Sequence, residues 1–138
     1  MLNTKVLNTA ILETLPIKGA LTIAKGEVNK SEHTFQLGAV VWKGRRILSS
    51  GHNNVRGSWK ITDEYKDWPD SYCAEKDALL KLSKAETKGA QILVIRVSNS
   101  GSLSKSYPCK GCLKMLKDYG IRKIWYVNDI GNIVWEKI

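Results

Sequence analysis

Three cysteines stand in two short runs of the chain, Cys73-Ala74-Glu75 and Pro108-Cys109-Lys110-Gly111-Cys112. Three thiolates can hold one Zn²⁺ and leave its fourth position open to water, as in a catalytic zinc site, whereas a structural site uses four protein ligands. Only His33 or His52 could supply a fourth ligand, and neither stands at the tight spacing of such a site. The cysteines therefore predict a catalytic zinc centre, with a structural zinc site or buried free thiols as the alternatives.

Glu75 follows the first cysteine by two residues, so we expect its carboxylate beside the metal and not among the ligands. Zinc lowers the pKa of bound water from about 15.7 to about 7. A carboxylate at this point can take the proton of that water and pass it to the substrate and then to the leaving group. Glu75 is the predicted catalytic acid and base.

The cysteines are expected at the starts of two helices, where the helix N-terminus stabilises a thiolate and lowers its pKa. Cys109 and Cys112 are three residues apart and would face the same way in a helical turn. Three thiolates on Zn²⁺ keep one net negative charge, and we expect it to be offset by the helix dipoles or by a cation that donates to a ligand sulfur. Arg56 and Lys76 are the nearest candidates in the sequence.

Apolar periodicity and turn residues predict the elements that position these side chains. Residues 73–86 and 109–119 are expected to form the two helices that carry the cysteines, with the buried strand 91–97 between them. Residues 98–106 are expected to form a surface loop and 55–72 a long loop rich in aromatic side chains. The remaining expected elements are helices over 3–15 and 20–28, a hairpin of strands 34–42 and 46–50, and a hairpin of strands 121–127 and 133–138.

The chain has 138 residues, 43% of them hydrophobic, which predicts a single globular domain over 1–138, with an N-terminal helix and connector in 1–19. It contains no apolar run long enough for a membrane span and no secretory signal, so we expect a cytoplasmic protein that does not bind membranes. The net charge of +9 fits an anionic partner, a nucleotide or a nucleic acid, or a basic surface without a specific partner.

The chain resembles the cytidine deaminase superfamily, and the small deaminases encoded by phages in particular. Cys73-Ala74-Glu75 and Pro108-Cys109-x-x-Cys112 match its zinc motif, and the run from Leu37 to Val41 and the run from Ser50 to Asn53 resemble its first strand and its G-x-N element. The resemblance covers residues 20–138 and implies an α/β, three-layer fold: a mixed five-stranded sheet with helices on both faces and an antiparallel C-terminal hairpin. It also implies a homo-oligomer.

The same resemblance implies roles for further residues. Asn53 would bind the sugar or the base, the backbone of Ala74 would contact the base edge, and the carbonyl of Tyr107 would accept the exocyclic amine. Asn53 can also be explained as a turn residue, and His52 as a solvent-facing turn histidine.

Two features indicate the substrate class. Cysteine as the first ligand and a short C-terminal hairpin resemble deaminases of free cytidine. The glutamate by which those enzymes bind the ribose is replaced here by Val55, followed by Arg56, which favours a phosphorylated substrate. We therefore predict a zinc-dependent hydrolase, a cytidine or deoxycytidylate deaminase, that converts cytosine in a free nucleoside or nucleotide such as dCMP or deoxycytidine to uracil and ammonia.

Two other functions remain open. Trp59, Trp68 and Tyr72 could stack the bases of single-stranded DNA or RNA, which would make the protein a polynucleotide deaminase acting on cytosine or adenine. These aromatic residues could equally pack on the domain or on a neighbouring subunit. A zinc module that only binds nucleic acid is disfavoured, because such a site has no use for Glu75.

Overall fold

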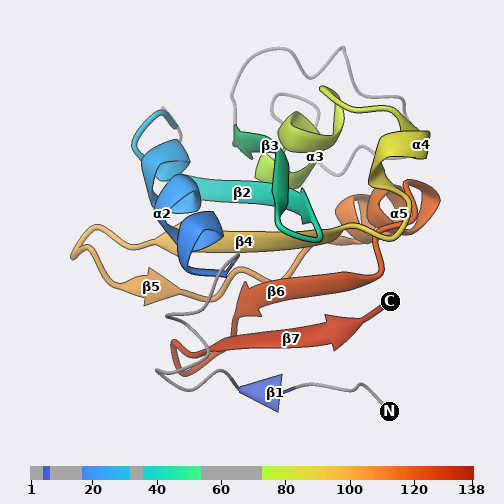
Figure 1. Ribbon diagram of the computed structural model, residues 1–138. Coiled ribbons are helices and arrows are strands. Elements are labelled where there is room, and N and C mark those ends of the chain that lie inside the picture. Colours follow the sequence, from blue (N-terminus) through green and yellow to red (C-terminus); the bar gives the residue numbers. More distant parts are fainter. Residues whose placement is uncertain (1–4, 7–16, 32–35, 54–72) are drawn as a thin grey trace.

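The computed structural model describes residues 5–6, 17–31, 36–53 and 73–138, and Figure 1 shows their arrangement. Its elements are, in chain order, β1 (Lys5–Val6), α2 (Ile17–Val28), β2 (Gln36–Lys43), β3 (Arg46–His52), α3 (Ala74–Leu79), α4 (Lys84–Thr87), β4 (Gln91–Val97), β5 (Leu103–Ser104), α5 (Lys110–Asp118), β6 (Lys123–Val127) and β7 (Ile133–Lys137). No helix among these residues is long and apolar enough to cross a membrane.

The strands form one mixed sheet in the order β1-β7-β6-β4-β2-β3, and β5 pairs with β4. The apolar strand β4 lies inside the sheet, with β2 antiparallel to it and β6 parallel to it. A parallel pair needs a crossover connection, and α5 provides it. β6 and β7 form the expected antiparallel C-terminal hairpin.

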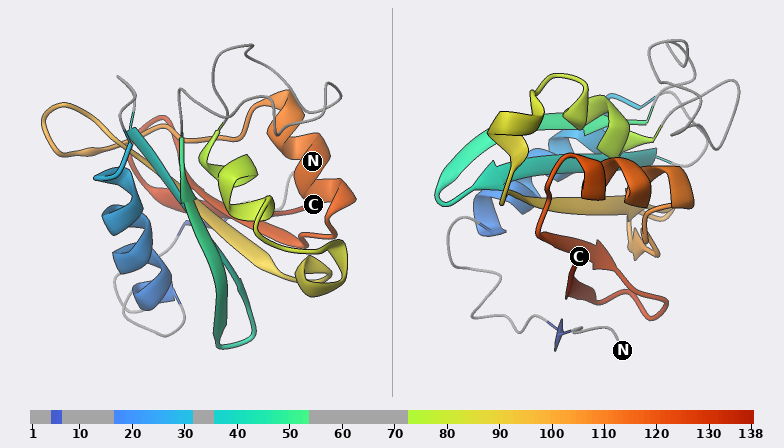
Figure 2. Two further views of the ribbon diagram at one scale, coloured as in Figure 1. Left: turned by 90° about the horizontal axis from the view of Figure 1, so that it is seen from above. Right: turned by 90° about the vertical axis from the view of Figure 1, so that its right-hand side faces the viewer.

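Helices cover both faces of the sheet, as Figure 2 (left) shows, which confirms the expected three layers. α2 buries Ala20, Ala24 and Val28 against one face, and α3 and α5 pack on the other. Gly38 of β2 lets α2 approach closely, because a Cβ at Gly38 would collide with the backbone carbonyl of Ala24. All five predicted strands are present, and the described residues add the short strands β1 and β5.

Four expectations about the elements need correction. The helix predicted over 73–86 is two helices: α3 ends at Leu79, and Ser83 starts α4 with a capping box to Glu86. The sequence Ser83-x-x-Glu86 is the signature of a helix start, and it prevails over the apolar periodicity that runs through it. Residues 5–6 were expected in a helix but pair with β7 as strand β1; the rest of 3–15 lies outside the described residues.

The other two corrections concern a helix start and a loop. α2 begins at Ile17, three residues before the predicted start at 20, so it takes up most of the expected connector. The segment 98–106 is not entirely a surface loop, because Leu103 and Ser104 pair with β4 and Ser106 is buried.

Candidate active site

The three cysteines meet between the starts of α3 and α5. Cys73 is the N-cap of α3, Cys109 is the N-cap of α5, and Cys112 lies in the first turn of α5. The Sγ atom of Cys109 lies 3.4 Å from that of Cys73 and 3.1 Å from that of Cys112, and all three lie within 4.8 Å of one another. The three are free thiols, so the cluster has the composition of a metal site.

The spacing of the sulfur atoms fits a tetrahedral metal. Zinc–sulfur bonds of about 2.3 Å place two tetrahedral ligands roughly 3.8 Å apart, within reach of the spacing found here. The contact with Cys109 is the largest cause that raises the pKa of Cys73, and burial is the largest that raises the pKa of Cys112. Deprotonating such a cluster requires a cation among the sulfurs.

Gly51 of β3 allows α3 to lie close to the sheet. A Cβ at Gly51 would lie 2.5 Å from the backbone nitrogen of Ala78 and 2.7 Å from the carbonyl oxygen of Ala74. Ser49 Oγ donates a hydrogen bond to the carbonyl oxygen of Ala78 at 2.9 Å, and the backbone N–H of His52 donates to Asp77 Oδ2 at 3.0 Å. These contacts fix the height of α3 above β3 and therefore the position of its first residues.

Ser106 fixes the position of the chain that leads into α5. Its hydroxyl donates to the carbonyl oxygen of Val94 at 2.7 Å and accepts from the backbone N–H of Val127 at 2.8 Å. Ser106 thus joins the middle of β4 to the end of the parallel strand β6, three residues before Cys109. This serine falls in the segment predicted as a surface loop, and its role was not predicted, because hydrogen bonds between distant segments leave no local signal.

Glu75 lies in the first turn of α3 and is only 2% exposed. Burial is the main cause that raises its pKa to about 7, and the neighbouring sulfur of Cys109 adds to the effect. Its Oε1 atom is buried without a hydrogen-bond partner among the described residues. A carboxyl group in this state can exchange a proton near neutral pH.

Lys76 is one of the two cations predicted near the cluster, and the structure describes it. It is buried as well, and its charge lowers the pKa of Glu75.

Asn53 lies directly after β3 and is buried. Its Oδ1 atom accepts hydrogen bonds from Ser31 Oγ at 2.6 Å and from the backbone N–H of Leu37 at 2.9 Å. The side chain therefore joins the end of α2, the start of β2 and the end of β3. This tertiary position goes beyond the turn role that the sequence left open.

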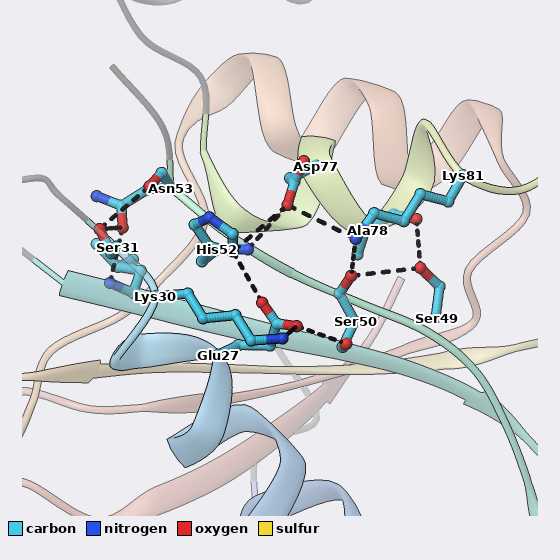
Figure 3. Close-up of polar contacts among 11 residues, drawn as sticks. Glu27, Lys30, Ser31, Ser49, Ser50, His52, Asn53, Asp77, Ala78 and Lys81 are labelled. Atoms are coloured by element: carbon cyan, nitrogen blue, oxygen red, sulfur yellow. Dashed lines mark hydrogen bonds and ion pairs between the residues drawn. The ribbon is translucent and has the colours of Figure 1, made fainter. Parts of the chain in front are cut away.

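A network of charged groups surrounds the neighbouring residue His52, as Figure 3 shows. His52 Nδ1 lies 2.8 Å from Glu27 Oε2 and 3.9 Å from Asp77 Oδ2. Glu27 Oε1 accepts hydrogen bonds from Ser50 Oγ at 2.9 Å and from Lys30 Nζ at 3.1 Å. His52 is thus half-buried and paired, and its interpretation as a solvent-facing turn residue was wrong. Glu27 was missed because its partner is far away in the sequence.

The remaining predicted substrate residues differ in exposure. Ala74 is fully buried at the start of α3, whereas the side chain of Tyr107 is 41% exposed beside the segment that leads to Cys109. Tyr107 packs edge-on against Tyr126 and contacts the buried Glu136. The sequence analysis did not single out Glu136. The predicted Arg56 lies outside the described residues. So do His33, Val55 and the aromatic residues Trp59, Trp68 and Tyr72.

The chain is similar to known proteins in sequence and in fold. Residues 16–128 match the model of the cytidine and deoxycytidylate deaminase zinc-binding region. ComE operon protein 2 of Bacillus subtilis (strain 168) is 30% identical over 103 residues, which is 69% of this chain and 49% of that protein. The chain therefore spans about half the length of this curated relative.

Two solved structures have a similar fold. A dCMP deaminase from the cyanophage S-TIM5, in its apo form, is 22% identical with a TM-score of 0.61 over 89% of this chain and 86% of its own. A cytidine deaminase from Burkholderia pseudomallei is 18% identical with a TM-score of 0.62 over 87% of this chain and 91% of its own. The zinc-binding region and the cysteine cluster confirm Zn²⁺ as the cofactor. The chain belongs to the cytidine and deoxycytidylate deaminase family.

Proposed function

We propose that this protein is a zinc-dependent deaminase of cytosine in a free nucleoside or nucleotide such as dCMP or deoxycytidine. The reaction consumes water and yields the uracil compound and ammonia. One observation carries the proposal: a buried carboxyl group, Glu75, lies beside three clustered thiols that fit a metal. A purely structural metal site gains nothing from a buried acid whose Oε1 atom has no partner among the described residues.

Cys73, Cys109 and Cys112 would hold the zinc. When bound, the metal supplies Lewis acidity that makes a water molecule a nucleophile near neutral pH. Glu75 would accept a proton from water and donate it to the ring nitrogen of cytosine. It would then accept the proton of the hydroxyl group added to the base and donate it to the departing amine. A pKa of about 7 suits both directions of transfer, because the carboxyl group is then neither a strong acid nor fully protonated.

Three further residues would position the base and its sugar. The backbone of Ala74 contacts the base edge, Asn53 binds the sugar or the base, and the carbonyl of Tyr107 accepts the exocyclic amine. The hydrogen bonds from Ser31 and Leu37 hold the Asn53 side chain in place, which lowers the entropy lost on binding. Arg56 would bind the phosphate of a nucleotide. A second structure of the cyanophage enzyme, in complex with dCMP and dUMP, is also similar to this chain. It is 22% identical with a TM-score of 0.56 over 89% of the chain, and its ligands support a nucleotide as substrate.

The test compares dCMP, deoxycytidine and a cytosine-containing oligonucleotide as substrates for the zinc-loaded protein. Formation of uracil is followed by chromatography and release of ammonia by a coupled assay. We expect turnover of a free nucleoside or nucleotide. Glu75→Gln should keep the zinc and lose a factor of about 10² to 10⁴ in kcat. Activity on the oligonucleotide alone would instead establish the polynucleotide deaminase.

A matched control separates the role of Glu75 from a general effect of losing one carboxylate. Glu86→Gln makes the same chemical change on the exposed helix α4, and glutamine can still complete the capping box with Ser83. This variant should keep full activity. Wild-type turnover by Glu75→Gln would refute the assignment of Glu75 as the catalytic acid and base.

We further propose that the chain acts as a single cytoplasmic domain within a homo-oligomer.

A further inference from the structure

Six basic side chains gather at the end of the sheet where β4 and β6 begin. They come from the β2–β3 turn and its flanks, from α4 with the residue after it, and from the residue before β6, and all six are exposed. We call this group the distal basic patch; its members are Lys43, Arg45, Arg46, Lys84, Lys88 and Arg122.

Contacts around two glycines show that these segments touch. A Cβ built at Gly89 would lie 4.0 Å from Lys43 Cε, and one built at Gly120 would lie 3.0 Å from Lys88 Cα. Arg122 Nε donates a hydrogen bond to the carbonyl oxygen of Gly89 at 3.2 Å. The patch is therefore one continuous surface assembled from three parts of the chain, and not a run of lysines along one helix.

One acidic residue, Glu86, compensates the charge of the patch in part: hydrogen bonds from Ser83 are the main cause that lowers its pKa, and the charge of Arg46 adds to the effect. None of its six members forms an ion pair with an acidic residue within the part of the chain that the structure describes. Glu86 is the acidic residue of α4, and its carboxylate accepts a hydrogen bond from the backbone N–H of Ser83. Holding like charges this close costs free energy, and an anionic ligand would recover it.

The patch and the cysteine cluster lie at opposite ends of the domain. Figure 2 (left) shows α3 and α5 beginning at one end of the sheet, with the β2–β3 turn and α4 at the other. The nine residues of α5 span about 14 Å at 1.5 Å per residue, with Cys109 before the first and the segment leading to Arg122 after the last. A ligand on the patch therefore leaves the catalytic end open.

We propose that the distal basic patch binds the phosphate backbone of a nucleic acid, as a docking surface separate from the catalytic centre. Arginine and lysine neutralise a row of phosphates without reading the bases. An apolar partner is disfavoured, because the exposed large hydrophobic residues of the described chain, Tyr107 and Ile130, lie at the other end. The proposal does not depend on which cytosine compound the enzyme deaminates.

The probe is a fluorescent single-stranded oligonucleotide of twenty thymidines, which offers no exocyclic amine to the catalytic site. Fluorescence anisotropy gives its dissociation constant at several salt concentrations. The patch variant is Lys43→Gln with Lys88→Gln. The control is Lys18→Gln with Lys25→Gln, the same loss of charge at exposed positions of α2.

For the wild type, the logarithm of the binding constant should fall linearly with the logarithm of the salt concentration. The slope should become shallower by about 1.4 in the patch variant, about 0.7 for each phosphate that is no longer neutralised, and stay unchanged in the control. The patch variant should turn over at the wild-type rate whichever free cytosine compound the wild type accepts, and excess dUMP should not displace the oligonucleotide. The same loss of binding in both variants, displacement by dUMP, or binding only to vesicles of anionic lipid would overturn the proposal.

Discussion

Glu27 Oε2 lies 2.8 Å from His52 Nδ1, so a carboxylate on α2 is joined to the last residue of β3. The pair crosses from a helix on one face of the sheet to an edge strand. Because Asp77 of α3 binds the backbone N–H of the same histidine, the helices of both faces meet at His52. The pair therefore stabilises the end of β3 next to Asn53.

Removing the charge of Glu27 should destabilise the protein. Glu27→Gln keeps the shape of the side chain but loses the charge-assisted hydrogen bond to the half-buried His52, a kind of bond worth about 1.5 to 3 kcal/mol. The bond to Lys30 adds little, because the Lys30 side chain is 64% exposed. We expect the free energy of unfolding in urea to fall by about 2 kcal/mol. Glu86→Gln should cost far less, since its side chain is exposed. Equal losses in the two variants would contradict the structural role of Glu27.

Acid should weaken the same interaction. Burial by itself would raise the pKa of Glu27, but hydrogen bonds from His52, Ser50 and Lys30 outweigh it and hold the pKa below 4.5. A carboxyl group with a lowered pKa in the folded state adds stability above the pKa of the unfolded state, and this stability is lost as the pH falls through the folded value. Between pH 6 and pH 3.5 the wild type should therefore lose more stability than Glu27→Gln. A parallel decline would show that Glu27 is not responsible.

Gly51→Ala should disturb the active site through packing. The new methyl group would lie 2.5 Å from the backbone of Ala78, and overpacking of this kind typically costs about 1 to 3 kcal/mol. Since α3 has to move, Cys73 moves with it, and we expect weaker zinc binding in a metal-competition assay. Gly26→Ala is the control. No atom lies within 4 Å of a Cβ there, so in the helix α2 it should stabilise the protein by about 0.5 to 1 kcal/mol.

Metal analysis should find one zinc per chain. Replacing Cys112 with serine removes a buried thiol of the cluster and should abolish zinc retention during purification, whereas Glu75→Gln should retain the metal. A chelator should lower the melting temperature of the wild type, because a ligand that binds only the folded state stabilises it. Retention of zinc by Cys112→Ser, or an unchanged melting temperature after zinc removal, would show that the cluster is not the metal site.

The two tyrosines that contact Glu136 should contribute unequally to the stability of the protein. Tyr126 donates a hydrogen bond of 2.5 Å to Glu136 Oε1, while the hydroxyl of Tyr107 lies 3.5 Å from Oε2. Glu136 is 1% exposed, and a buried carboxylate that loses a partner costs about 1 to 3 kcal/mol or more. We expect Tyr126→Phe to lose stability in this range in thermal or urea unfolding, and Tyr107→Phe to lose much less. The reverse order would contradict the geometry.

Local chemistry made the cysteine cluster predictable. Spacing along the chain placed Cys109 and Cys112 in one helical turn, and the apolar run of β4 marked a strand buried inside the sheet. Contacts between distant segments were not predictable in this way: Glu27 with His52, Ser106 with Val94, and Gly51 with Ala78 join residues whose spacing carries no periodic signal. Strand β1 has only two residues, too short a segment for a pattern that could compete with the helical one.

The outer edge of β3 lies at the edge of the sheet, where another chain could pair with it. An edge strand exposes backbone groups that can pair with another chain. Here Asp77 accepts from the backbone N–H of His52, and Lys81 donates to the carbonyl oxygen of Ser50 at 2.6 Å. Asp77 of α3 and Lys81, which follows this helix, therefore occupy two edge groups that another strand would need for pairing. A substitution at Asp77 or Lys81 should therefore favour aggregation even where the cysteine cluster is intact.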